Sequence, residues 1–209
     1  MAGPGSLPQR VFLLAYDPGK GRVRMGTNLG AMLRAAALAD LYLNGHLTDE
    51  GGRAVIDVRH PCRDPVLDAL RDEIAGSRPR TWRSWVDTRQ KAAVSAVRRQ
   101  LSDDGWVRLE PHRILGLIPT TKVTISDPRV RHQLLGRVNG ALKNPIDRID
   151  RADAALVAIV AAADLKLVLD RRTSRAHERR IEQLTELSGP SGPALRRSIE
   201  VAALGGEAG

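Results

Sequence analysis

The chain has 209 residues, of which 42% are hydrophobic and 3% aromatic, so we expect one domain with a core of Leu, Val, Ile and Ala, a composition that favours helices packed on helices. Its single cysteine, Cys62, excludes an internal disulfide, and its longest apolar run, residues 154–163, is far too short for a membrane span of about 20 residues. The formal charge of +9 favours an acidic partner, either nucleic acid or the cytoplasmic face of a membrane, although an excess of Arg over Lys also arises in GC-rich genomes.

The first half of the chain predicts three helices and a hairpin, after a short apolar run at residues 11–15. The first of these helices has apolar residues at the 3.6-residue period and ends at Asn44-Gly45, a pair typical of a left-handed cap. The predicted elements are, in chain order, a helix over 28–41, a hairpin over 47–58, a helix that begins at Asp64-Pro65, and a longer helix over 83–101.

Residues 106–126 predict a second hairpin with unusual surroundings. Two apolar runs are separated by residues 110–113 (Glu-Pro-His-Arg), a pattern that fits strand, short turn and strand. Apolar side chains flanked by basic residues suit an element that meets an anionic lipid surface, and these residues are Arg108, His112, Arg113 and Lys122. The alternative is a hairpin whose apolar face packs on the body of the protein, as most short apolar strands do.

The second half of the chain predicts helices over residues 128–142, 149–169, 176–187 and 194–204. The segment 149–169 is apolar nearly all round in its middle, so we expect it to be the central helix. The sequence therefore predicts a mainly α protein, with amphipathic helices around the helix at about 149–169 and two small β-hairpins at about 47–58 and 106–118. We expect a single domain over residues 7–204 between flexible tails at 1–6 and 205–209.

Chemistry typical of enzymes is missing from the sequence patterns. The histidines have no metal-ligand spacing, and no Gly-x-Ser-x-Gly segment, P-loop or dinucleotide-binding motif is present. The adjacent Asp103 and Asp104 precede Gly105 in an expected turn, where Asp is common for local reasons. The N-terminal segment lacks the parts of a signal peptide. We therefore expect a cytoplasmic binding protein, not an enzyme, with no metal and no cofactor.

Three ordered stretches together resemble the Golgi phosphoprotein 3 family, whose members bind phosphatidylinositol 4-phosphate at membranes. The first comprises Val-Phe-Leu-Leu at 11–14 and residues 28–47, which end in Leu-Tyr-Leu-Asn-Gly-His-Leu. The second includes Gly-Trp-Val at 105–107 and Arg-Ile-Leu-Gly-Leu-Ile-Pro-Thr-Thr at 113–121. The third is Asn-Pro-Ile-Asp-Arg-Ile-Asp-Arg at 144–151, which leads into the apolar helix. The resemblance spans roughly residues 7–204 and points to a bacterial, actinobacterial-type member.

The resemblance implies a central helical bundle wrapped by amphipathic helices, and a hairpin that helps membrane contact, self-association or both. It also implies a peripheral location at the inner face of a membrane. The partners expected from it are an anionic phospholipid surface, a second copy of the chain, and membrane-associated enzymes. The hairpin residues assigned to membrane contact or self-association are Arg113, Ile114, Leu115, Leu117 and Ile118.

The resemblance also implies a headgroup site, since family members bind the lipid phosphate through a tryptophan, an arginine on the following helix and two later arginines. The helix arginine falls on Arg34, which the helical period places off the apolar stripe, free to face a headgroup. The tryptophan position falls on Met25, a departure, and the later arginines fall on Lys91 and Val94. Arg98, seven residues after Lys91 and on nearly the same helix face, is expected to supply the missing charge.

The departures weaken the expected selectivity, because Arg offers a bidentate fork to a phosphate whereas Lys offers a point charge. We therefore expect binding of an anionic phospholipid headgroup, phosphatidylinositol 4-phosphate or a related phosphoinositide-like lipid, through Arg34, Lys91, Arg98 and Met25. One alternative is nucleic-acid binding, with the helix at 28–41 as a recognition helix and the hairpin at 47–58 as a wing. Another is a family member that acts as an enzyme or accessory protein of metabolism, which no residue pattern supports.

Overall fold

The computed structural model describes residues 4–17, 19–20, 22–23, 28–58, 60–114 and 118–206. In this part of the chain the fold is mainly helical, with small antiparallel sheets, as the sequence predicts. The helices are α1 (Leu7–Leu14), α2 (Leu29–Leu43), α3 (Pro65–Ala75), α4 (Trp82–Asp87), α5 (Gln90–Asp103), α6 (Pro128–Lys143), the 3-10 helix η1 (Ile146–Arg148), α7 (Arg151–Ala162), α8 (Arg171–Ala176), α9 (Glu178–Ser188) and α10 (Ser191–Gly206). The strands are β1 (Tyr16–Asp17), β2 (Arg22–Val23), β3 (Leu47–Glu50), β4 (Arg53–Ile56), β5 (Arg80–Thr81), β6 (Val107–Ile114) and β7 (Ile118–Ile125).

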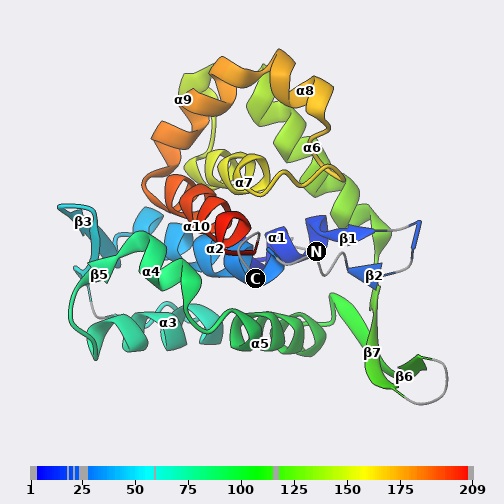
Figure 1. The fold of residues 1–209 in the computed structure, drawn as a ribbon. Coiled ribbons are helices and arrows are strands. Elements are labelled where there is room, and N and C mark those ends of the chain that lie inside the picture. Colours follow the sequence, from blue (N-terminus) through cyan, green and yellow to red (C-terminus); the bar gives the residue numbers. More distant parts are fainter. Residues whose placement is uncertain are drawn as a thin grey trace.

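Two helices, α2 and α7, form the centre of the fold (Figure 1). Both are rich in alanine and apolar on nearly every side, so other helices approach them from several directions. The central helix expected at 149–169 is confirmed as α7, which lies at the centre of the fold. It ends earlier than expected because the chain turns at Asp164, whose φ is +47°. The sequence interpretation missed that α2, which packs against α1, α3, α4, α5, α7 and α10, shares the centre.

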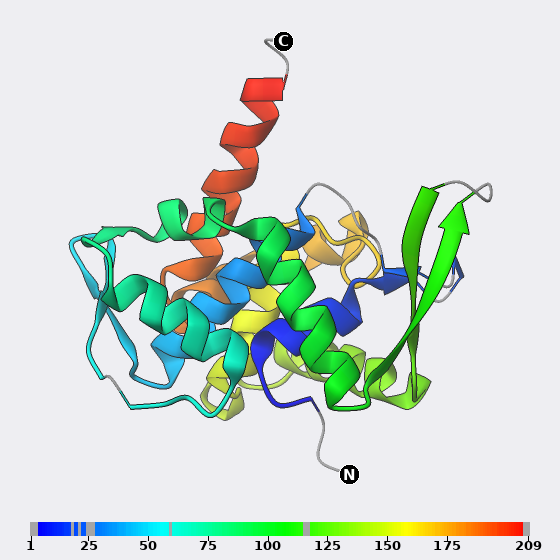
Figure 2. The same cartoon turned by 90° about the horizontal axis from the view of Figure 1, so that it is seen from below.

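The other helices surround this pair in two groups. In the view of Figure 1, α3 and α5 lie along the lower edge, whereas α6, α8 and α9 cover the upper part. The hairpin of β6 and β7 extends from one side of the body (Figures 1 and 2). Figure 2 shows that the C-terminal part of α10 also projects away from the rest of the molecule.

The helix expected over residues 83–101 is wrong as a single element, because the structure has two helices there. Thr88 is extended and Arg89 is in the left-handed region with φ +49°, which ends α4 and begins α5 in a new direction. The apolar period continues through the break, with Val86, Val97 and Leu101 all buried, so a pattern search does not detect it.

Helix α1 corrects the interpretation of residues 11–15 as a mere apolar run. The helix begins at a capping box formed by Ser6 and Gln9, a Ser-x-x-Gln signal that the sequence does contain. The backbone N–H of Leu7 donates to the Asp40 carboxylate at 2.7 Å, and the Gln9 amide donates to Asp104 at 2.6 Å. These two bonds connect α1 to α2 and to the end of α5. Whether the termini are flexible tails stays a prediction.

Both expected hairpins exist, and one of them turns at a different place. β3 and β4 turn at Gly51 and Gly52, both with positive φ, and β5 adds a third strand. β6 pairs with β7 from Val107↔Ile125 to Ile114↔Ile118. The expected turn at 110–113 is therefore wrong, because these residues continue β6 and the reversal falls between Ile114 and Ile118. A two-stranded ladder consists of edge strands, where a proline such as Pro111 is tolerated.

We predict that Gly189→Ala destabilises the fold. Gly189, between α9 and α10, has φ +84°, and an added Cβ would lie 2.4 Å from a ring carbon of Tyr42. The backbone strain alone is of order 1–3 kcal/mol, so the free energy of unfolding in a urea titration should fall by at least that amount. Gly136→Ala on α6, where nothing lies within 4 Å of the added Cβ, is the control and should unfold at the same or a higher urea concentration. Equal effects of the two changes would contradict the close approach at Gly189.

Candidate functional site

Arg34, on α2, is buried with 5% of its surface exposed. Its Nε donates to the backbone carbonyl of Trp85 at 3.0 Å, one terminal nitrogen to Glu73 at 3.1 Å, and the other to the Thr88 hydroxyl at 3.1 Å. The expectation that Arg34 is free to face a headgroup is therefore wrong, since its guanidinium is engaged on all three nitrogens. The helical period predicted an exposed Arg34 because it assumes that one face of the helix is open to solvent. Helix α2 is enclosed on nearly every side, so no exposed face remains for Arg34.

Glu73 connects the buried Arg34 to the protein surface. The second oxygen of its carboxylate lies 3.5 Å from Nε of Arg89, whose side chain is 73% exposed. Burial lowers the pKa of Arg34 from its ordinary value, and the Glu73 charge partly offsets this effect. Two guanidinium groups share one carboxylate in this cluster, which leaves a net positive charge at the junction of α4 and α5.

The N-terminal ends of α2 and α5 meet beside this cluster. A Cβ added to Gly30 would lie 2.6 Å from the Cβ of Gln90 and 2.9 Å from its carbonyl oxygen, so only glycine permits this approach. The first turn of α5 follows Arg89, which makes no side-chain cap hydrogen bond. Its unpaired backbone N–H groups add partial positive charge at the same place. Met25, the other residue expected here, lies outside the described residues.

The two remaining headgroup residues are both on α5. Lys91 is exposed in the first turn and Arg98 is half-buried two turns later, roughly 10 Å along the helix. Neither forms an ion pair in the described part of the chain, so both charges are available to a ligand. The structure thus brings Lys91 next to the N-terminal end of α2, where Arg34 is one turn away, but it places Arg98 farther off.

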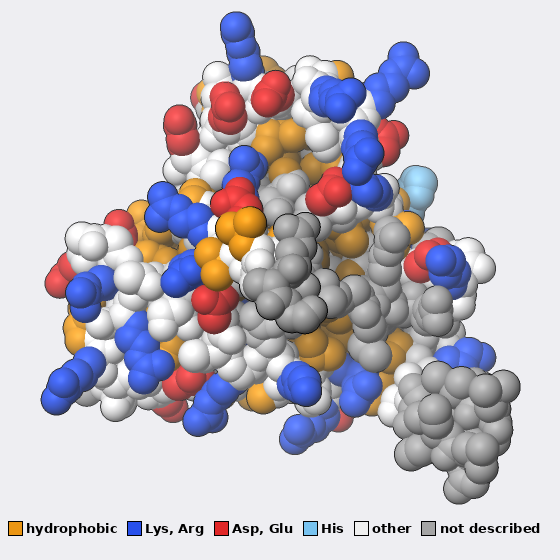
Figure 3. Space-filling model, viewed as in Figure 1, with side chains coloured by type: hydrophobic (Ala, Val, Ile, Leu, Met, Phe, Trp, Pro, Cys, Tyr) orange, Lys and Arg blue, Asp and Glu red, His pale blue; other side chains and the backbone are white. Residues whose placement is uncertain are grey.

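A larger basic surface surrounds these residues, and the sequence interpretation missed it. Residues 78–99 contain seven cations and one carboxylate, Asp87, so this segment accounts for a charge of +6 out of +9. Figure 3 shows Lys and Arg side chains, with some Asp and Glu side chains between them, along the lower edge of the molecule, where α3 and α5 lie in Figure 1. A charge count over short windows would have found it. We call it the basic rim, and its cations are Arg78, Arg80, Arg83, Arg89, Lys91, Arg98 and Arg99.

Two tryptophans anchor the basic rim to the core. Trp82 and Trp85 are both buried, and the Trp82 indole N–H donates to Asp49 at 2.6 Å. The guanidinium of Arg80 lies 5.1 Å from the centre of the Trp85 ring, a distance typical of a cation–π contact. These contacts hold α4 against β3 and β5, and they fix the backbone on which the arginines stand.

The hairpin of β6 and β7 is anchored at its base. Val107, Val123 and Ile125 are buried against the body of the protein, so the base packs as an ordinary core element. Strand residues Arg113, Ile114 and Ile118 pair at the far end, where the structure describes their backbone alone. Leu115 and Leu117 lie outside the described residues. The role of the hairpin end in membrane contact or self-association stays a prediction.

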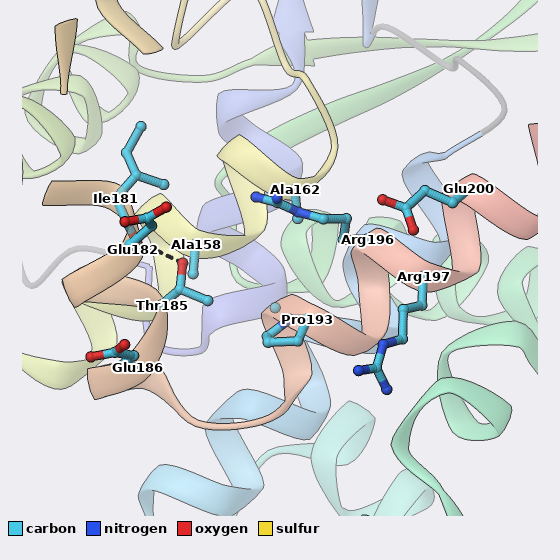
Figure 4. A pocket seen from close by; sticks show the side chains of 11 residues that line it. Ala158, Ala162, Ile181, Glu182, Thr185, Glu186, Pro193, Arg196, Arg197 and Glu200 are labelled. Carbon is cyan, nitrogen blue, oxygen red and sulfur yellow. Dashed lines mark hydrogen bonds between the residues drawn. The ribbon is translucent and has the colours of Figure 1, made fainter. Parts of the chain in front are cut away.

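A groove lies away from Arg34, between α7, α9 and α10, with a volume of about 400 Å³. Ala158, Ala162 and Ile181 are among its apolar lining, and charged residues of α9 and α10 surround it (Figure 4). No group of three or more His, Cys, Asp or Glu side chains that could hold a metal ion occurs among the described residues. Burial and the Asp68 carboxylate raise the pKa of the Cys62 thiol to about 11, so this thiol is a poor nucleophile at neutral pH.

None of the helices in the described residues combines the length and the apolar character needed to cross a bilayer.

Comparison with known families decides what the chain is related to. The family model of Golgi phosphoprotein 3 (GPP34) matches residues 7–202. The chain belongs to this family. No curated protein matches the chain. The Golgi phosphoprotein 3 match extends from α1 into α10, and it includes every residue assigned to the headgroup site and to the hairpin. A bacterial origin for this Golgi phosphoprotein 3 family member stays a prediction.

We predict that Arg34→Lys lowers stability although the charge is kept. A lysine ammonium cannot reach the Trp85 carbonyl, Glu73 and Thr88 together, because those three acceptors match the planar guanidinium fork. The free energy of unfolding should fall by on the order of 1–3 kcal/mol, the cost of leaving buried acceptors unpaired. The same change at the exposed Arg99 is the control and should leave the urea midpoint unaltered. Identical midpoints for both variants would show that the contacts of Arg34 contribute nothing to folding.

Proposed function

We propose that this Golgi phosphoprotein 3 family member is a peripheral membrane-binding module that recognises an anionic phospholipid headgroup. The proposed headgroup is phosphatidylinositol 4-phosphate or a related phosphoinositide-like lipid. The observation that carries the proposal is the basic rim, a segment with seven cations and one carboxylate beside the cluster of Arg34, Glu73 and Arg89.

A phosphate at this edge would meet donors from several directions. Arg89 and Lys91 are exposed at the start of α5, beside the first backbone N–H groups of that helix, which have no partner within the helix. Arg34 contributes its charge from beneath, and its bonds to Trp85 and Thr88 hold the α4–α5 junction in place. Arg98 would contact a neighbouring headgroup or the leaflet surface. In this proposal Arg34 holds the backbone of the site in position. It would contact the ligand directly only if its ion pair with Glu73 broke.

Charge and apolar insertion together account for reversible membrane binding. Each Lys or Arg close to an anionic leaflet contributes about 1 kcal/mol, so the basic rim alone can contribute several. The hairpin end, from Arg113 through Ile118, would add apolar contact at the acyl boundary, where one fully buried leucine side chain contributes about 1.5–3 kcal/mol. Neither contribution anchors the protein alone, but the two act at the same surface if the hairpin and the rim face the membrane together.

Nucleic-acid binding is the less favoured alternative, because a basic rim also suits a phosphodiester backbone. The structure removes the helix-and-wing version of this hypothesis. The expected recognition helix is α2, which is enclosed by six other helices and cannot enter a groove of DNA.

We predict that Lys91→Glu combined with Arg98→Glu weakens binding to anionic vesicles. The change replaces two cations of the basic rim by anions, which should weaken partition onto phosphatidylcholine vesicles with about 20% phosphatidylinositol 4-phosphate by roughly tenfold or more. Neither side chain forms an ion pair among the described residues, so the fold should be unaffected. Co-sedimentation over a range of lipid concentrations measures the change.

Arg175→Glu combined with Arg179→Glu is the matched control for that variant. Both residues are exposed on α8 and α9, at the upper part of the molecule in Figure 1, and the net charge changes by the same amount. Equal loss of binding in both double variants would mean that only total charge matters and would contradict a site on the basic rim. Retention of a DNA duplex without any vesicle binding would favour the alternative function.

Vesicles of matched charge test the headgroup itself. Phosphatidylinositol 4-phosphate, unphosphorylated phosphatidylinositol and phosphatidylserine should be compared at equal surface charge. Tighter binding to the 4-phosphate would support a defined site at Arg89 and Lys91. Equal binding to all three would mean that Met25 and Val94, which replace an aromatic and a basic residue of the family pattern, have removed the selectivity.

A further inference from the structure

The last turns of α10 project from the body of the protein (Figure 2). Residues 201–205 are all exposed, and the two largest of them, Val201 and Leu204, expose 50% and 71% of their surface. An exposed helix end composed of apolar residues is costly in water. This surface is independent of the basic rim and of the proposed function.

The projecting end continues a stripe that begins beside the groove between α7, α9 and α10. Pro193, Arg197, Glu200 and Leu204 are spaced four, three and four residues apart, which places them on one face of α10. The first three line the groove of about 400 Å³, whose other apolar lining comes from α7 and α9 (Figure 4). One face of α10 thus has an apolar groove at its start, two opposite charges in its middle and an exposed leucine at its end.

The two charges on this face of α10 are exposed to solvent. Arg197 and Glu200 form no ion pair in the part of the chain that the structure describes, and the two side chains point apart in Figure 4. Glu182 and Glu186, on the α9 side of the groove, are likewise exposed and without an ion pair among the described residues. These charges face solvent and are open to a partner from outside the chain.

We propose that the partner is a second copy of this chain, docked with its α10 antiparallel to the first. A twofold axis midway between Ser198 and Ile199 places Leu204 of each copy opposite Pro193 of the other, at the apolar groove. The same axis places each Glu200 opposite the other copy's Arg197. One register therefore buries both leucines and forms two ion pairs, which is the self-complementarity that a twofold interface requires.

The composition of the stripe favours this occupant over a lipid surface. Its charges sum to zero, so it has no attraction to an anionic leaflet, and inserting Leu204 into lipid would bring Glu200 towards negative headgroups. Two paired α10 helices and the groove beside each of them form a small interface. We therefore expect a dissociation constant on the order of micromolar or weaker.

Sedimentation velocity of the full chain from about 1 to about 200 μM tests the proposal. Wild type should shift from monomer to dimer over this range, and Leu204→Glu should remain monomeric at every concentration. Leu204 is largely exposed, so this variant should fold normally, as its urea midpoint would verify. Ile146→Glu is the control, since Ile146 is also an exposed apolar residue, 40% exposed, and lies far along the chain in η1. Its dimerisation should equal that of wild type.

A charge-swap experiment tests the register. Arg197→Glu and Glu200→Arg should each be monomeric alone, because each places like charges opposite one another twice. An equimolar mixture of the two variants should form a heterodimer, because every facing pair is then opposite in charge.

Three results would overturn the proposal. Wild type could remain monomeric at all concentrations. A dimer could persist in Leu204→Glu, which would place self-association elsewhere, for example at the hairpin of β6 and β7. The mixed charge variants could fail to associate although wild type dimerises.

Discussion

The enclosure of α2 is the constraint on which the rest of the structure depends. Six helices pack around it, and the small residues along it allow their close approach. Glycine at position 30 lets the start of α5 touch α2, and this contact places the first turn of α5 beside Arg34. A polar side chain inside such an environment must be fully paired. Glu73, Thr88 and the Trp85 carbonyl supply those partners, and in doing so they fix the junction between α4 and α5.

The proposed binding surface depends on that junction. Because Arg34 is held by a carboxylate that also contacts Arg89, the inner charge is connected to an exposed one, and the outer part of the site is free to meet a ligand. The basic rim extends this positive surface along β5, α4 and α5. Arg34, which the sequence interpretation treats as a direct ligand contact, is buried in this chain and shares Glu73 with Arg89, an exposed residue that the interpretation did not select.

Much of the architecture was predictable because periodicity reports burial. The helices at 128–142 and 149–169, the hairpin at 47–58 and the mainly α class followed from patterns of apolar residues, and the structure confirms them with shifted ends. Two features were not predictable in this way. Arg89 breaks a continuous apolar period through its backbone conformation, and Arg34 is buried because α2 is surrounded by segments distant in sequence. The sequence shows the basic rim as a segment rich in cations, but its position on the surface could be known only from the fold.

The measurement that tests the central claim most directly is hydrogen–deuterium exchange of the full chain with and without vesicles that contain phosphatidylinositol 4-phosphate. We expect slower exchange at the first turn of α5 and at the far end of the β6–β7 hairpin when vesicles are present, with α8 and α9 unchanged. Protection confined to α8 and α9, or vesicle binding with no change along residues 78–99, would contradict the proposed membrane-binding surface.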